Sequence, residues 1–240
     1  MKNIFLTAFL FSLLSNMFAR AEFVLISSPK GYAVVKAFST IQPIDTIWNG
    51  AAVFIDKRSE AGLHFEYSYN DRYTSTNLRK SGYLKPEDVI SIDSGAVLIP
   101  TIGFGNNLLF KEGSGIKVVM EQSAFDEKGN IITHKSGGDV FYMLINDREF
   151  YGCFGAPLTQ YKSIDIHISK TRITIKKEFF NDLYNPHLEK SLCYYRSDTN
   201  TIYLISGSEY HRNIQLGLVI WVIQDGEVKQ RMIKGKYIGN

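Results

Sequence analysis

Short apolar runs separated by turn residues follow one another along most of this chain, and this pattern is what most constrains its fold. Up to residue 92 the runs are broken by turn residues at 28–31 and 49–50 and by a polar stretch at 70–80. Residues 163–169 and 172–176 alternate strictly between apolar and polar side chains, which is the period of a strand with one buried face. The chain also has 14 Tyr and 16 Phe against 6 Pro, a balance that suits pleated sheets. The sequence therefore predicts a mainly β protein.

Composition and charge exclude several classes of protein. Hydrophobic residues make up 45% of the chain and charged residues 21%, which is typical of a globular protein and excludes a disordered tail or a coiled coil. The 27 basic and 24 acidic residues are nearly balanced, and Lys2 and Arg20 fall in a segment that we expect to be removed. Phosphate binding needs a cationic excess, so we expect no nucleic acid partner.

The first 21 residues resemble an export signal. Lys2 precedes an apolar run at residues 4–14, and Ala19-Arg20-Ala21 places small residues at the two positions that a signal peptidase reads. The alternative is a membrane anchor, but the run is about half the roughly 20 residues that a spanning helix needs. We therefore expect cleavage before Glu22, a periplasmic or secreted protein and no stable membrane insertion.

The two cysteines are Cys153 and Cys193. An even number of cysteines in an oxidising compartment is compatible with a disulfide that closes a loop of 40 residues. The alternative is a pair of buried thiols that pack as small hydrophobic side chains. Geometry rather than number decides between these two interpretations, and both stay open at this point.

Three segments near the start of the predicted mature chain resemble a known domain. Residues 31–36 (GYAVVK), 47–53 (IWNGAAV) and 81–84 (SGYL) are similar in order and spacing to the motifs of the bacterial SH3-like (SH3b) domain. The resemblance covers residues 23–93 and implies a small barrel that binds peptidoglycan or a peptide. Asn49-Gly50 also predicts a hairpin between the runs that flank it.

The rest of the chain divides at a glycine-rich stretch. We predict a signal peptide at 1–21, an SH3-like barrel at 22–93 and a glycine-rich connector with short strands at 94–115. Residues 116–240 are predicted to form an antiparallel β domain, including a tight turn at Asp225-Gly226. Its one short helix is expected at residues 177–184, just before Asn185-Pro186.

The candidate binding residues are aromatic. Tyr32, Trp48, Tyr69 and Tyr83 lie on or beside the segments that resemble the SH3-like domain, and flat rings of this kind stack on sugars or prolines. The alternative is that these rings are core or cross-strand packing residues. In the polar loop at 206–213, Tyr210 and Arg212 are candidate partner-binding residues, because Tyr and Arg are enriched at interface hot spots.

No motif in the sequence indicates catalysis, a metal or a cofactor. Asp165 and His167 share one face of a predicted strand, but they have no companion pair at metal-ligand spacing. Neither Cys153 nor Cys193 has the activating context of a catalytic thiol, so we expect no enzyme. The first hypothesis is an exported, non-enzymatic cell-envelope protein that binds peptidoglycan, a peptide or a partner protein. The alternatives are a periplasmic immunity protein against a cell-wall-targeting effector and an unrecognised cell-wall hydrolase.

Overall fold

The chain forms two compact units. The computed structural model describes residues 22–59, 62–69, 78–105, 107–137, 140–153, 155–208, 210–211, 214–215 and 217–234. Unit 1 comprises residues 1–67 and 81–91, and unit 2 comprises residues 68–80 and 92–240. The predicted signal peptide at 1–21 lies outside the described residues.

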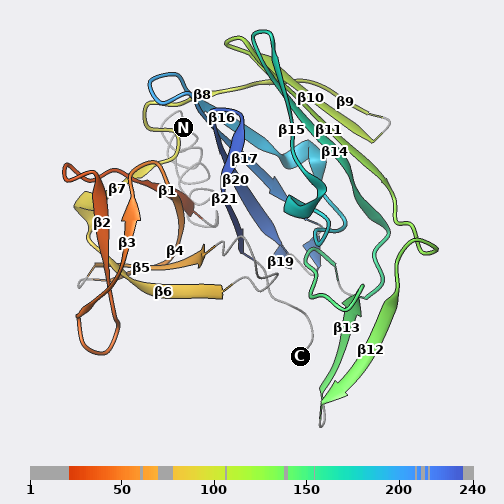
Figure 1. The fold of residues 1–240 in the computed structure, drawn as a ribbon, viewed down its shortest axis with the longest axis horizontal. Coiled ribbons are helices and arrows are strands. Elements are labelled where there is room, and N and C mark those ends of the chain that lie inside the picture. Colours follow the sequence, from red (N-terminus) through yellow and green to blue (C-terminus); the bar gives the residue numbers. More distant parts are fainter. Residues whose placement is uncertain are drawn as a thin grey trace, which may run out of the picture. The chain divides into compact units, whose positions relative to one another are not determined.

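Unit 1 is built around one seven-stranded sheet (Figure 1). Its strands are β1 (Glu22–Ile26), β2 (Tyr32–Lys36), β3 (Pro43–Trp48), β4 (Ala52–Ser59), β5 (Gly62–Tyr69), β6 (Leu78–Leu84) and β7 (Val89–Ser91). They follow the order β3-β2-β6-β5-β4-β1-β7, so β3 and β7 are the edges. No closed barrel is seen among the described residues, and the SH3-like barrel stays a prediction.

Alternation along β2 separates the two faces of this part of the sheet. On β2, Ala33 and Val35 are 1% and 0% exposed, whereas the flanking Tyr32, Val34 and Lys36 are partly exposed. On β1 and β4 both faces are buried, because the consecutive residues 23–26 and 52–55 are all buried. Only part of the other face, including that of β2, is therefore free to carry polar and aromatic side chains.

The predicted hairpin at Asn49-Gly50 is wrong. Gly50 has φ +84° and forms a turn there, with the Ala51 N–H donating to the Trp48 carbonyl at 3.3 Å. The strands on either side, β3 and β4, are not neighbours in the sheet, because β3 pairs with β2 while β4 pairs with β1 and β5. The Asn49 side chain explains the turn, since it accepts a hydrogen bond from the Ser28 N–H and donates one to the Ser28 carbonyl, both at 2.9 Å.

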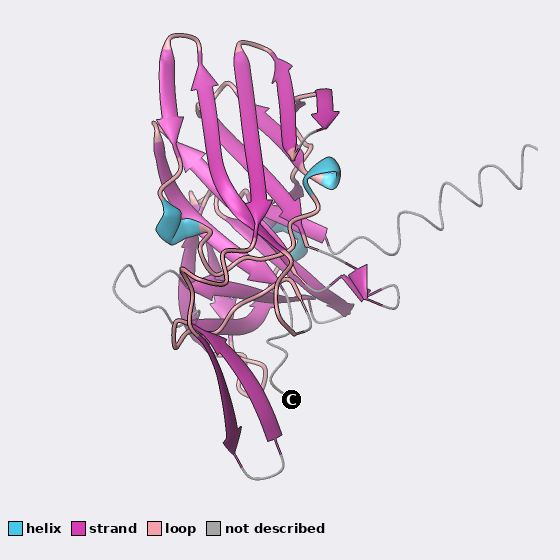
Figure 2. Cartoon of the chain, turned by 90° about the vertical axis from the view of Figure 1, so that its right-hand side faces the viewer, coloured by secondary structure: helices cyan, strands magenta, loops and turns pink. Residues whose placement is uncertain are grey.

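Unit 2 contains two five-stranded antiparallel sheets, visible in Figures 1 and 2. The first has the order β15-β14-β11-β10-β9 and the second the order β21-β20-β17-β16-β8. The strands of the first sheet are β9 (Thr101–Gly105), β10 (Leu108–Gly113), β11 (Ile116–Ala124), β14 (Thr159–Ile168) and β15 (Thr171–Thr174). Those of the second are β8 (Val97–Leu98), β16 (Leu192–Arg196), β17 (Thr201–Gly207), β20 (Leu218–Gln224) and β21 (Glu227–Lys234).

Two separate strand pairs complete unit 2. One joins β12 (Ile132–Gly137) to β13 (Val140–Ile145), and Figure 2 shows this pair extending away from the larger sheets. The other joins β18 (Tyr210–His211) to β19 (Ile214–Gln215).

The main core of unit 2 lies between its two five-stranded sheets. β11 contributes Ile116, Val118 and Met120, and the opposite sheet contributes Leu204 and Trp221, all at 0 or 1% exposure. The indole N–H of Trp221 donates to the Phe179 carbonyl at 2.9 Å, so this large ring is buried without losing its hydrogen bond. The two sheets therefore form a β-sandwich.

The glycine-rich stretch at 94–115 differs from the expected connector. β8 pairs with β16, β9 with β10 and β10 with β11, so β8 and β9 are edge strands and β10 is an inner strand of the sandwich. The glycines allow this, because Gly115 has φ +75° in the turn from β10 to β11. The turn residues of this stretch make the sequence look like a linker. The apolar residues between the turns form strands of the two sheets.

Helical structure among the described residues is limited to three 3₁₀ turns, η1 (Pro86–Asp88), η2 (Lys177–Phe179) and η3 (Leu188–Lys190). The short helix expected at 177–184 is therefore reduced to η2. The backbone beyond η2 pairs elsewhere, since the Tyr184 N–H donates to the Tyr151 carbonyl and the Tyr151 N–H donates to the Asp182 carbonyl. Within the described part of the chain, no helix has the length and apolar character needed to cross a membrane.

Candidate functional site

Two of the predicted binding residues form a pair at the edge of unit 1. Tyr32 on β2 lies directly opposite Trp48 on β3, and their rings meet edge to face with centroids 5.7 Å apart. Trp48 is 69% exposed. A ring this exposed contributes little to the core, while its contact with Tyr32 is the cross-strand packing of the alternative interpretation.

Tyr83 lies in a second group of rings further along the same face. It is on β6 opposite Lys36 of β2, and its ring contacts that of Phe38 at 4.6 Å between centroids. His64 on β5 completes the group, with its ring 4.4 Å from Phe38 and 6.4 Å from Tyr83. Nδ1 of His64 lies 3.5 Å from Oδ2 of Asp56.

The strand pattern places both groups on one side of the sheet. Cross-strand partners point to the same face, and the residues flanking them on β2 and β5, Val35 and Phe65, are fully buried on the other. Tyr32 and Lys36 mark the two ends of β2, about 13 Å apart at the rise of a strand. We call this surface the outer aromatic face; its rings are Tyr32, Phe38, Trp48, His64 and Tyr83.

Phe38 and His64 were not among the sequence candidates. The alternation Leu63-His64-Phe65 could have indicated His64. Leu63 and Phe65 are core residues, so the imidazole between them points to the other face of the sheet. Phe38 follows β2 in a turn, and nothing in the local sequence indicates that it contacts β6.

Three other candidate residues cannot be placed. Tyr69 and Tyr210 are at the ends of β5 and β18, but their side chains lie outside the described part, as does all of Arg212.

Both cysteines are buried free thiols, so the structure contains no Cys153–Cys193 disulfide. Cys193 packs in the sandwich core, whereas Cys153 belongs to a separate apolar cluster that includes Phe150 and Tyr184. Burial raises the pKa of Cys193 to about 12, although Lys111 nearby works in the opposite direction. A thiol in this state is a poor nucleophile.

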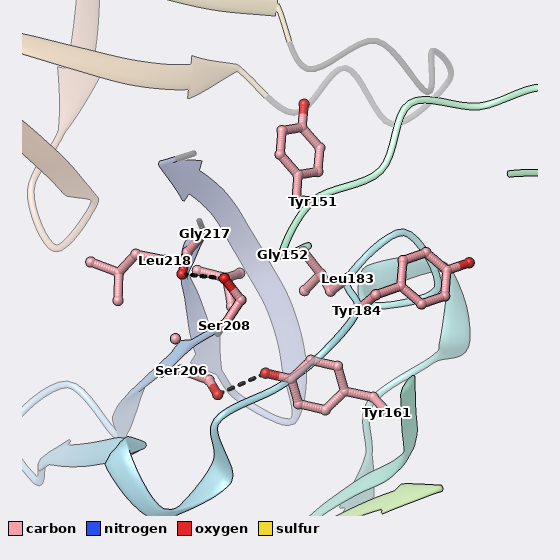
Figure 3. Close-up of a pocket in the computed structure, with 11 residues that line it drawn as sticks. Tyr151, Gly152, Tyr161, Leu183, Tyr184, Ser206, Ser208, Gly217 and Leu218 are labelled. Atoms are coloured by element: carbon pink, nitrogen blue, oxygen red, sulfur yellow. Dashed lines mark hydrogen bonds between the residues drawn. The ribbon is translucent and has the colours of Figure 1, made fainter. Parts of the chain in front are cut away.

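Hydroxyl groups line a small interior pocket of unit 2 (Figure 3). The Tyr161 hydroxyl donates to Oγ of Ser206 at 2.7 Å, and Oγ of Ser191 lies 2.8 Å from the same atom. The pocket has a volume of about 10 Å³, close to the size of one water molecule. Burial raises the pKa of Tyr161, so its hydroxyl stays protonated and is not a general base for a serine.

The pocket wall depends on a close backbone approach. Gly152 has φ +107°, and a Cβ on this residue would lie 2.1 Å from the Tyr184 carbonyl oxygen. Ser208 donates its hydroxyl hydrogen to the Gly217 carbonyl at 3.0 Å, so this serine is also engaged. The arrangement is that of a structural hydrogen-bond network in the sandwich.

The described residues contain no group of three or more His, Cys, Asp or Glu side chains that could hold a metal ion. Asp165, considered above with His167, accepts hydrogen bonds from Arg172 at 3.1 Å and from Thr174 at 2.6 Å. Its carboxylate therefore accepts hydrogen bonds between β14 and β15.

Comparisons with known proteins give no match: no family model, curated protein or solved structure resembles the chain at a significant level.

Proposed function

We propose that this chain is an exported, non-enzymatic binding protein of the bacterial cell envelope, and that its outer aromatic face recognises peptidoglycan. The observation that carries the proposal is the exposure of Trp48 beside Tyr32, on the same face as the Tyr83 group. Sugar rings and extended peptides bind by stacking on flat side chains, and such binding needs no titrating group.

The geometry of the face also suits an extended ligand. Its two ring groups lie about 13 Å apart along β2, with Lys36 near the second group. A single polymer chain can contact both ring groups at once, so that two weak contacts contribute to one binding affinity. The resemblance of residues 23–93 to the SH3-like domain supports the same ligand class.

Binding to purified peptidoglycan sacculi tests the proposal. We expect the wild-type protein to cosediment with sacculi and Trp48→Ala to bind about tenfold more weakly or worse, as for a hot-spot side chain. Tyr83→Ala should reduce binding as well. Ile131→Ala is the matched control, because Ile131 is also 70% exposed but lies in unit 2.

The alternatives predict different results in the same assay. An immunity protein would show no retention on sacculi and would instead bind an effector protein. A hydrolase would release soluble cell-wall fragments, and His167→Ala or Cys153→Ser would stop this release. Retention that is unchanged in Trp48→Ala and Tyr83→Ala, both still folded by thermal melting, would overturn the role of the aromatic face.

Export is tested separately. We expect protein from the periplasmic fraction to begin at Glu22 when its intact mass is measured. A full-length, membrane-bound species would contradict removal of residues 1–21.

A further inference from the structure

A second, polar cavity lies in unit 2 and shares Tyr184 with the hydroxyl-lined pocket. It has a volume of about 280 Å³ and is formed where the turn after β13 meets the segment that follows η2. This is slightly below the roughly 300 Å³ at which pockets for drug-sized ligands begin. The cavity is lined by Ile145, Asn146, Arg148, Glu149, Phe150, Asn181, Asp182 and Tyr184.

The apolar part of the cavity wall is rigid. Phe150 and Tyr184 are 6% and 4% exposed, and their rings pack edge to face with centroids 5.8 Å apart. Ile145 is 3% exposed and belongs to the same apolar cluster. Part of a ligand can therefore lie against an apolar surface whose side chains are already held in place.

The charged part of the wall is fixed by its turn. Asn146 and Asp147 have φ of +53° and +58°, and the backbones of Ile145 and Arg148 exchange two hydrogen bonds across them. The Asn146 side chain anchors the turn further, accepting from the Ile131 N–H and donating to Oδ1 of Asn130. The positions of the next two residues, Arg148 and Glu149, are thereby set.

The charges in this wall are balanced. Arg148 and Glu149 are exposed, and neither side chain makes a hydrogen bond or an ion pair with any residue that the structure describes. Asp182 also lines the cavity, and its Oδ1 is held by the Arg231 guanidinium behind it. The Arg148 guanidinium and the Glu149 carboxylate thus remain available to a ligand. The charge of the neighbouring Asp182 carboxylate is already compensated by Arg231.

From this arrangement we infer that the cavity binds a small zwitterion of amino-acid or dipeptide size. The ligand carboxylate pairs with the Arg148 guanidinium, its ammonium pairs with the Glu149 carboxylate, and its side chain lies against Phe150 and Tyr184. A ligand with a single charge would leave one of the two protein charges without a partner. This inference is independent of the proposed function, because it concerns unit 2 alone.

Calorimetric titration with a defined set of probes tests the inference on the full mature chain. The probes are leucine and the dipeptide Ala-Ala, each also in an N-acetylated form and in a C-terminal amide form. We expect at least one unblocked probe to bind, and both of its blocked forms to bind at least about tenfold more weakly. Arg148→Gln and Glu149→Gln should weaken binding of the unblocked probe to a similar degree.

Matched controls keep the result interpretable. Lys170→Gln removes an exposed charge from the turn between β14 and β15 and should leave affinity unchanged. Arg148 and Glu149 make no side-chain bonds within the described residues, so their variants should fold normally, which a melting curve verifies. Absence of binding to both unblocked probes, equal binding to a blocked form, or unchanged affinity in either variant would overturn the inference.

Discussion

The Tyr161 hydroxyl on β14 and Oγ of Ser206 on β17 join the two sheets of the sandwich through a buried hydrogen bond of 2.7 Å. Ser191 extends the network, because its Oγ lies 2.8 Å from that of Ser206. Ser206 is therefore the central member, with a partner on either side.

Because Ser206 has two partners and Tyr161 has one, removing their hydroxyl groups should lower the free energy of unfolding by different amounts. Ser206→Ala leaves the Tyr161 and Ser191 hydroxyls buried without their shared partner and should lower the free energy of unfolding by about 1 to 3 kcal/mol. Tyr161→Phe removes one donor but keeps the Ser191–Ser206 pair, so about 1 kcal/mol is expected. Urea denaturation measures both, with Tyr195→Phe as a control that removes only the solvent-exposed hydroxyl hydrogen bond to Asn200. A larger loss in Tyr161→Phe than in Ser206→Ala would contradict the network.

The ion pair between Asp182 and Arg231 is mostly buried, with side chains 17% and 8% exposed. Removing one partner leaves the other charge in the protein interior, so Asp182→Ala should destabilise unit 2 by about 3 kcal/mol or more. Asp198→Ala breaks the exposed pair with Arg196 and should cost about 1 kcal/mol or less. Equal losses in the two variants would show that Asp182 is solvated.

Asp165 should affect stability in acid. Burial would raise its pKa, but hydrogen bonds from Arg172 and Thr174 outweigh this and hold the pKa below its ordinary value of 3.8. A lowered pKa contributes stability above the unfolded value, and this contribution is lost as pH falls through the folded value. Asp165→Asn should therefore lower the free energy of unfolding by about 1 kcal/mol or less at pH 6, because Arg172 is exposed.

The measurement is urea denaturation of wild type and Asp165→Asn between pH 2 and pH 6. The two proteins should converge as pH drops below about 4. Glu178→Gln, at an exposed site on η2, is the control for removing a surface carboxylate. A constant gap between wild type and Asp165→Asn would contradict the lowered pKa.

The cysteines should behave as protected thiols. Since burial raises the pKa of Cys193 to about 12, iodoacetamide at pH 8 should leave it unmodified in the folded protein and modify both cysteines in denaturant. The neutral buried thiol also contributes stability that is present below its ordinary value of 9.0 and decreases as pH rises above it. An unreduced mass lower by about 2 Da than the reduced mass would show a disulfide instead.

Local signals in the sequence predicted local structure well. Asp225-Gly226 has φ of +52° and +81°, and it joins β20 to β21 in the tight hairpin that the sequence indicated. Asn49-Gly50 carries the same signal but joins strands that are not neighbours, because the pairing of β3 with β2 is decided by distant residues. A turn motif fixes the direction of the chain and does not choose the partner strand.

The candidate site, too, was predictable from the sequence only where local signals decide it. Tyr32, Trp48 and Tyr83 could be selected from strand segments, but their grouping with Phe38 and His64 depends on the order of strands in the sheet. The cavity beside Arg148 was not predicted at all, since the approach of Asn181 and Asp182 to the turn after β13 is a tertiary contact without a local pattern.

The chain has only two tryptophans, and each unit contains one of them. Trp48 is 69% exposed on the aromatic face, whereas Trp221 is fully buried in the sandwich core. Their emission should differ in wavelength and in access to iodide, because one indole is in water and the other is not. The protein therefore contains a natural optical reporter for each unit, so ligand contact on unit 1 and unfolding of unit 2 can be followed separately in one unlabelled sample.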